Sequence, residues 1–147
     1  MTEMQKPHMI FVVIEDSDED FETVMEAVKL AEVKAEVRRA VTGEGGLSLL
    51  RKLTQQHPII VLMDLNTPGT DGREALVLLK SDPALKSIPV VVFSTSANPK
   101  DVGFCYAAGA NAYHVKPVRY PDHRQLVIDL VRYWVDRVAI PAGETQS

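Results

Sequence analysis

Residues 61–72 read VLMDLNTPGTDG, and they carry a carboxylate at the end of an apolar run. An unbroken apolar run ends at Met63, the carboxylate of Asp64 follows directly, and the chain then enters a turn rich in proline and glycine. Continuously apolar runs of this length are typical of parallel strands that are covered on both faces. We therefore expect Asp64 to stand at the carboxyl end of a buried strand.

Apolar runs of strand length recur along the chain, and a segment with helical periodicity follows each of them. The predicted strands are 9–14, 35–40, 59–63, 88–93 and 111–115. The predicted helices are 18–31 with Ser17 or Asp18 as N-cap, 44–55, 73–80, 99–108 between the caps Asn98 and Gly109, and 121–138. Strict alternation of this kind predicts a three-layer, doubly wound α/β domain with a parallel sheet.

Length and composition limit the class of protein. The chain has 147 residues, of which 46% are hydrophobic and 24% charged, which suits one domain. We expect a flexible N-terminus at 1–8, the domain at 9–138 and a C-terminal tail at 139–147. No apolar run is long enough for a membrane helix or a signal peptide, so we expect a cytoplasmic protein. The net charge of −4 argues against nucleic-acid binding, and the single cysteine excludes a zinc site built from thiols.

Polar residues follow the predicted strands where ligands of such sheets bind, at the carboxyl ends. Glu15 and Asp16 follow the first strand, Asp64 the third, Ser94 the fourth, and Lys116 the fifth. Carboxylates gathered in one place repel each other unless a cation neutralises them, and Mg²⁺ prefers such oxygen ligands. The pattern predicts a phosphoryl-transfer site in which Asp64 is the nucleophile and Lys116 and Ser94 stabilise charge.

These residues carry a resemblance to the receiver domains of two-component response regulators, from about Met9 to Val138. The matching motifs are E-D at 15–16, D-x-N-x-P-x-x-D-G at 64–72, Ser94, and K-P at 116–117. The resemblance implies a flavodoxin-like (βα)5 fold with strand order 2-1-3-4-5. It also implies a phosphoprotein that takes part in phosphorelay signal transduction.

The resemblance assigns a role to each matching residue. Asp64 would be the phosphoacceptor, Asp16 a direct Mg²⁺ ligand, Glu15 an acid acting on the metal through water, Asn66 a ligand through its main-chain carbonyl, and Lys116 the partner of the phosphoryl group. Glu15 departs from the more usual aspartate at its position.

Two further implications concern the Lys116–Pro117 bond and the switch from the resting to the phosphorylated state. The Lys116–Pro117 bond is expected to be cis, which would direct the lysine inward. Ser94 would move toward the phosphoryl group, and the ring of Tyr113 would enter the space that it leaves. The surface expected to respond comprises the helix at 99–108, the strand at 111–115 and the helix at 121–138.

The last predicted helix is apolar around most of its circumference. Only Gln125, Asp129, Arg132 and Asp136 form a narrow polar stripe, while packing on a sheet needs one apolar stripe. We expect the surplus apolar surface to mediate a homodimer. Coverage by the chain's own tail, AIPAG at 139–143, is the alternative.

A narrower resemblance concerns partners. The Tyr133–Trp134 pair and the stretch LKSDPALKSIPVV at 79–91 are similar to stand-alone response regulators that pair with phytochromes. This implies a sensor histidine kinase, of the phytochrome type, as phosphodonor. Because no output domain follows in the sequence, we expect the signal to pass to a downstream binding partner or phosphotransfer protein.

Three other functions fit the pattern less well. Phosphatases of the haloacid dehalogenase type have a general acid two residues after the nucleophile, where this chain has Asn66, which cannot donate and recover a proton. A flavin- or nucleotide-binding protein would need a phosphate loop after the first strand, and IEDSDED is acidic instead. An unphosphorylated receiver-like module would lack some of the acids or the lysine. We expect no enzyme acting on external substrates, only self-catalysed phosphotransfer and autodephosphorylation.

Overall fold

The computed structural model describes residues 9–53, 57–66 and 72–141. The predicted flexible N-terminus at 1–8, the predicted helix end at 54–55, the turn at 67–71 and the tail beyond residue 141 lie outside these ranges. Among the helices within them, none combines the length and the apolar character that crossing a membrane requires.

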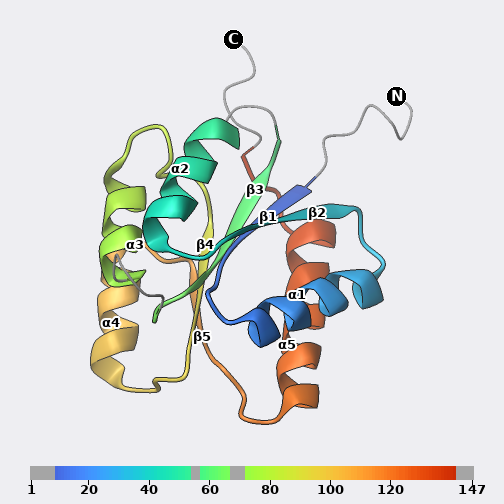
Figure 1. Ribbon diagram of the computed structural model, residues 1–147. Helices are drawn as coiled ribbons and strands as arrows, with labels where there is room; N and C mark the ends of the chain where they lie inside the picture. Colours follow the sequence, from blue (N-terminus) through green and yellow to red (C-terminus); the bar gives the residue numbers. More distant parts are fainter. Residues whose placement is uncertain (1–8, 54–56, 67–71, 142–147) are drawn as a thin grey trace.

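Strands and helices alternate along the chain as predicted. The strands are β1 Met9–Ile14, β2 Ala35–Ala40, β3 Ile59–Asp64, β4 Val90–Ser94 and β5 Ala112–Val115. The helices are α1 Asp18–Ala31, α2 Gly43–Leu53, α3 Gly72–Ser81, α4 Pro99–Ala108 and α5 Tyr120–Asp136. All strand pairs are parallel and the strand order is 2-1-3-4-5, so the predicted flavodoxin-like fold is confirmed. Figure 1 shows α1 and α5 on one face of the sheet and α2, α3 and α4 on the other.

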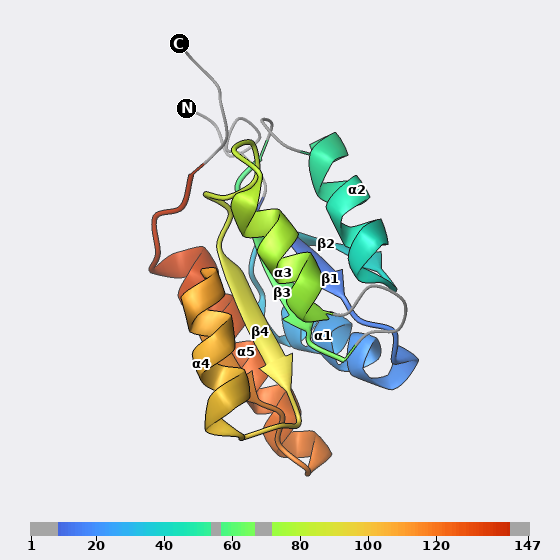
Figure 2. The same cartoon turned by 90° about the vertical axis from the view of Figure 1, so that its left-hand side faces the viewer.

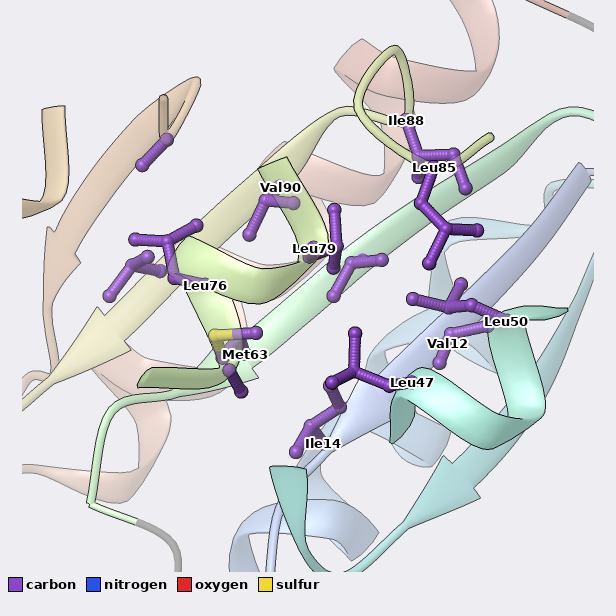
Figure 3. Close-up of a cluster of buried hydrophobic side chains, with 14 of the residues drawn as sticks. Val12, Ile14, Leu47, Leu50, Met63, Leu76, Leu79, Leu85, Ile88 and Val90 are labelled. Carbon is purple, nitrogen blue, oxygen red and sulfur yellow. The ribbon is translucent and has the colours of Figure 1, made fainter. Parts of the chain in front are cut away.

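The packing of the central strands explains why their sequences are apolar without interruption. In β1, Val12 and Ile14 contact the core beneath α2, α3 and α4, whereas Phe11 and Val13 contact the core beneath α1 and α5. Figure 3 shows the first of these cores, in which Leu47 of α2 lies beside the strand residues. Because both faces are covered, no position of β1 or β3 is left for a polar residue until Asp64.

Capping residues fix where two helices begin and so place them against the strand ends. The Ser17 hydroxyl accepts a hydrogen bond from the N–H of Asp20, which identifies Ser17 as the N-cap of α1. Asn98 caps α4 in the same way, and Gly109 ends α4 with a φ of 113°. The predicted caps of α4 are thereby confirmed. Figure 2, which looks onto the layer of α2, α3 and α4, shows α3 and α4 side by side over the sheet.

The fourth strand starts later than predicted. The N–H of Ile88 donates to the carbonyl of Leu85 at 3.0 Å and closes a turn, and Pro89 has no N–H to give to a strand partner. Regular pairing therefore begins at Val90.

Helix α5 offers less free apolar surface than its sequence suggests. Leu126, Trp134 and Val135 are half-buried against the core beneath α1 and α5, and Ile140 from the tail joins them there. Of the apolar residues in α5 after His123, only Tyr133 is strongly exposed, at 58%. The expected wide surplus is wrong, because α1 and the start of the tail cover most of it.

Candidate functional site

The carboxyl ends of β1, β3 and β5 bring three of the predicted residues into contact. Lys116 follows β5 and its Nζ lies 3.1 Å from Glu15 Oε1 and 3.1 Å from Asp64 Oδ2. Both acids are buried, with 5% and 8% of their surfaces exposed. A parallel sheet with this strand order places β1 and β3 side by side at its centre, which is why residues 101 and 52 positions from the lysine converge there.

A further carboxylate completes the group. Asp20, in the first turn of α1, accepts a hydrogen bond of 2.6 Å from Lys116 Nζ. Oxygens of Glu15, Asp20 and Asp64 all lie within 4.8 Å of one another, and no other such group of three occurs in the described ranges. The predictions missed Asp20; its signal in the sequence was its position one helical turn after Asp16, in the helix that Ser17 caps.

The predicted metal ligands Asp16 and Asn66 are placed differently. Asp16 is exposed and lies outside the group formed by Asp20 and its neighbours. The N–H of Asn66 donates to Asp64 Oδ1 at 3.0 Å, which fixes the orientation of the aspartate carboxylate. Asn66 thus contacts Asp64 through its main-chain N–H. The role of its main-chain carbonyl as a metal ligand stays a prediction, and so does the role of Asp16.

The two buried acids have opposite protonation tendencies. Burial is the main cause that raises the pKa of Glu15, to about 8, and the nearby Asp64 carboxylate adds to it. Burial also acts to raise the pKa of Asp64, but hydrogen bonds from the Glu15 carboxyl and from the Asn66 amide, together with the charge of Lys116, outweigh it and hold this pKa below its usual value. At neutral pH the pair therefore holds a proton on Glu15 and a negative charge on Asp64.

Lys116 stays charged in this environment. Burial alone would lower the pKa of its ammonium, but the hydrogen bond to Asp20 and the charges of Glu15 and Asp64 raise it. The site contains a permanent cation that faces the ionised aspartate. This arrangement can stabilise additional negative charge on oxygens brought next to Asp64.

The donor set also suits a divalent cation. All of the grouped ligand atoms are carboxylate oxygens, which hard cations such as Mg²⁺ and Mn²⁺ prefer. Asp20 and Asp64 together carry more negative charge than Lys116 alone neutralises. The residues present therefore fit a divalent metal ion.

The two predicted switch residues both hydrogen-bond Ser96, in the loop between β4 and α4. Ser94 is fully buried, and its hydroxyl accepts a hydrogen bond of 3.1 Å from the N–H of Ser96. The hydroxyl of Tyr113 donates to the carbonyl of the same Ser96 at 2.8 Å. Ser94 and Tyr113 are thus linked through one loop residue, while their movement on phosphorylation stays a prediction.

The predicted cis bond before Pro117 is wrong for this structure. Among the described residues no peptide bond is cis, so the Lys116–Pro117 bond is trans. The lysine nevertheless reaches the acids, because its N–H donates to the carbonyl of Ser94 at 2.8 Å and holds the backbone beside β4. Because the lysine side chain points inward without a cis bond, the Lys116–Pro117 bond keeps the trans isomer that X–Pro bonds slightly prefer.

Comparisons with known proteins agree with this geometry. The model of the response regulator receiver domain family matches residues 11–128. The response regulator Rcp1 of Synechocystis sp. is 34% identical over 150 residues, which cover 97% of this chain and all of the relative. A probable methanogenesis regulatory protein, FilR2 of Methanothrix harundinacea, is 30% identical over 86% of this chain and 83% of its own length.

Solved structures give the same result. The Mn²⁺-bound form of Rcp1 superposes with a TM-score of 0.82 at 33% identity, over 90% of this chain and 99% of that one. The phosphorylated cyanobacterial phytochrome response regulator RcpA superposes with a TM-score of 0.84 at 34% identity, over 91% and 99% of the two chains. With the carboxylates and the lysine gathered at the strand ends, the chain belongs to the response regulator receiver domain family.

Proposed function

We propose that this response regulator accepts a phosphoryl group on Asp64 from the phosphohistidine of a sensor kinase, assisted by Mg²⁺. The observation that carries the proposal is the contact of the buried Asp64 carboxylate with the ammonium of Lys116, 3.1 Å away, beside the buried Glu15. Asp64 is held ionised beside Lys116, while Glu15 takes up the proton. A nucleophilic carboxylate must be ionised, and this one is kept so without being exposed.

The proposed transfer draws on Asn66 and Lys116, which both hydrogen-bond the Asp64 carboxylate, and on Ser94. An Asp64 oxygen attacks the phosphorus, the new P–O bond forms, and the N–P bond of the donor breaks with its electron pair left on the imidazole nitrogen. The main-chain N–H of Asn66 donates to Oδ1 of Asp64, and the other oxygen, Oδ2, accepts a hydrogen bond from Lys116. The ammonium of Lys116 and the hydroxyl of Ser94 would bind the phosphoryl oxygens.

The proposed metal ligands are Asp16, Asp64, the Asn66 carbonyl and, through water, Glu15. Mg²⁺ would supply positive charge to the phosphoryl oxygens and offset the repulsion among the acids. Asp20 shares Lys116 with the site and is a further candidate for a water-mediated contact. Binding of the cation would release the proton that Glu15 holds, so the affinity for Mg²⁺ should rise with pH up to about 8.

The proposed phosphodonor is a light-sensing kinase of the phytochrome type. RcpA is described as a phytochrome response regulator, and the response regulator RPA3017, which functions in red-light signalling of R. palustris, superposes with a TM-score of 0.79 at 31% identity over 90% of this chain and 97% of that one. These relatives support a phytochrome as partner. The site would catalyse only its own phosphorylation and dephosphorylation, because Asn66 stands where a phosphatase would need an acid.

The proposed output is a change in the α4–β5–α5 surface. Ser94 and Tyr113 both bind Ser96, so movement of Ser94 toward a phosphoryl group would disturb the contact that anchors Tyr113. Changes there would reach a cytoplasmic partner or a phosphotransfer protein that binds this face.

We also propose that a homodimer uses the α4–β5–α5 surface. The exposed large apolar side chains on its elements are Phe104, Tyr106, Val115, Tyr120 and Tyr133, each between 41% and 58% exposed. They support a smaller contact than the sequence of α5 alone suggested. Sedimentation at micromolar concentration tests it, with and without phosphorylation, and a monomer in both states would refute the proposal.

Labelling with a small acyl phosphate tests the phosphoacceptor. Wild-type protein should become labelled in the presence of Mg²⁺ and lose the label slowly. Asp64→Asn should not be labelled, whereas Asp136→Asn, an equal change at an exposed position in the last turn of α5, should be labelled as wild type. Equal labelling of all three proteins would refute the assignment.

A further inference from the structure

The edge strand β2 places an arginine where its pattern calls for an apolar residue. Ala35 and Val37 are half-buried and pack against the core beneath α1 and α5. Arg39 is the next residue in this row, because side chains of a strand alternate between its two faces. Arg38 lies on the other face, is 44% exposed and pairs with Glu36 of its own strand.

The guanidinium of Arg39 reaches the loop that leaves β1. Its Nε donates to the main-chain carbonyl of Glu15 at 3.0 Å, and its Nη1 lies 2.9 Å from Asp18 Oδ1. Its central carbon lies 4.7 Å from the centre of the Phe21 ring, so the group is stacked on an aromatic face. One planar cation thus holds the loop and the first turn of α1 together.

Strand β2 in this way holds both main-chain groups of Glu15. The N–H of Glu15 donates to the carbonyl of Ala40 at 2.9 Å, and the carbonyl of Glu15 accepts from Arg39. With its backbone fixed on both sides, the carboxylate of Glu15 has one oxygen near Lys116 and the other accepting from the N–H of Ser17 at 3.2 Å. The position of this acid therefore depends on the end of a neighbouring strand.

One nitrogen of the Arg39 guanidinium is placed unfavourably for the stability of the fold. Its Nη2 is buried and makes no hydrogen bond to the residues that the structure describes. An unpaired buried donor is unfavourable, and it is tolerated where the rest of the side chain is constrained by another requirement. Here the constraint is the simultaneous contact with Glu15, Asp18 and Phe21.

The charge of Arg39 complements that of Lys116. Carboxylates crowd the segment from residue 15 to residue 20, which contains Glu15, Asp16, Asp18, Glu19 and Asp20. Lys116 contacts this segment from the side of the sheet's carboxyl ends, and Arg39 contacts it from the edge strand. Their attraction to the segment from two directions keeps its backbone in one place despite the repulsion among its acids.

We propose that Arg39 is a positioning residue for the phosphoacceptor site, acting through the main-chain carbonyl of Glu15. This inference rests on the proposed function of Asp64. Arg39 touches no reacting atom; it fixes the loop that carries Glu15 and Asp16, and thereby the acids that would hold the metal ion. Loss of its contacts should slow phosphorylation of Asp64 between about tenfold and a hundredfold, as misplacement of supporting groups does in enzyme active sites.

The test compares Arg39→Gln with Arg38→Gln, which removes the same charge from the adjacent position on the other face of the strand. The rate of labelling by a small acyl phosphate is measured over a range of Mg²⁺ concentrations. Arg39→Gln should be labelled slowly and Arg38→Gln at the wild-type rate. Equal rates in the two variants would overturn the proposal.

A second readout does not depend on phosphorylation. Hydrogen exchange of the Glu15 and Ser17 amides, measured without metal, should accelerate in Arg39→Gln and not in Arg38→Gln, because these amides hydrogen-bond only while the loop is in place. Unchanged exchange at both amides would equally contradict the role of Arg39.

Arg39→Lys keeps the experiment decisive if Arg39→Gln does not fold. Lysine retains the charge and can pair with Asp18, but it lacks the fork that bonds the Glu15 carbonyl at the same time. Slow labelling of Arg39→Lys supports positioning, and a wild-type rate overturns it. Asp64→Asn is included throughout: its labelling would refute the phosphoacceptor itself, whereas a failure confined to the arginine variants would refute only the inference about Arg39.

Discussion

The raised pKa of Glu15 should appear as a pH-dependent loss of stability in the metal-free protein. The folded state holds a proton on Glu15 up to pH of about 8, whereas the ordinary pKa of a glutamate is 4.5. Between these values the folded state binds one proton more than the unfolded state. Its free energy of unfolding must therefore fall as the pH rises through this window, and the stabilisation is complete only below the lower value.

Comparison with Glu15→Gln isolates this effect, because glutamine has a similar shape and does not titrate. One proton corresponds to about 1.4 kcal/mol per pH unit, so from pH 5.5 to 7.5 the stability of wild type relative to the variant should fall by up to about 2.7 kcal/mol. The lowered pKa of Asp64 acts in the opposite direction, but only at pH values below the usual aspartate range. The pKa values of His114 and His123, which burial lowers, affect both proteins alike.

The assay is urea unfolding at half-unit steps of pH in the presence of a chelator. Glu22→Gln, an exposed change on α1, is the control, and its curve should run parallel to that of wild type. A difference between wild type and Glu15→Gln that shrinks by about 1 kcal/mol or more over the window supports the assignment. Parallel curves for these two proteins would show that Glu15 is not the protonated member of the pair, and the division of charge at the site would be wrong.

Three further changes test the packing and charge of the domain. Lys116→Gln leaves the carboxylates of Asp20 and Asp64 and the carboxyl of Glu15 without their cation and should cost about 3 to 5 kcal/mol of unfolding free energy in urea, part of which Mg²⁺ restores. Gly72→Ala would place its Cβ 2.5 Å from the carbonyl oxygen of Leu65, a backbone atom that cannot move aside, and should lower the free energy of unfolding by about 1 to 3 kcal/mol. Lys80→Met leaves the carbonyl of Ile88 without its 2.7 Å hydrogen bond and should cost about 1 to 3 kcal/mol in the same measurement.

The sequence predicts the fold well because the pattern is local and repeated. The apolar runs of β1 and β3 have no polar positions, since helices cover both faces of the sheet, and this alone indicates parallel strands. Asn98 and Gly109 mark the ends of α4 through bonds within a few residues, so the neighbouring residues suffice to identify them. The convergence of Glu15, Asp64 and Lys116 then follows from the topology.

The sequence could not supply the contacts that depend on how α1 and β2 approach the site. Asp20 reaches Lys116 only because the angle of α1 brings its first turn over the strand ends, and residue spacing does not encode that angle. Arg39 appeared to be an ordinary charge on an edge strand, since its partner Glu15 is 24 residues away. The prediction of excess apolar surface on α5 was wrong for a similar reason. Helix α1 and Ile140 cover that surface, and both contacts depend on the tertiary structure.

Asp64 is the residue that we propose carries the phosphoryl group. The most direct measurement is to treat the protein with a small acyl phosphate and Mg²⁺, reduce the acyl phosphate with borohydride, and locate the modified residue by mass spectrometry of its peptides. Modification confined to Asp64 is the predicted result. Modification at Glu15, Asp16 or Asp20 instead, or at none of the acids at the strand ends, would refute Asp64 as the phosphoacceptor.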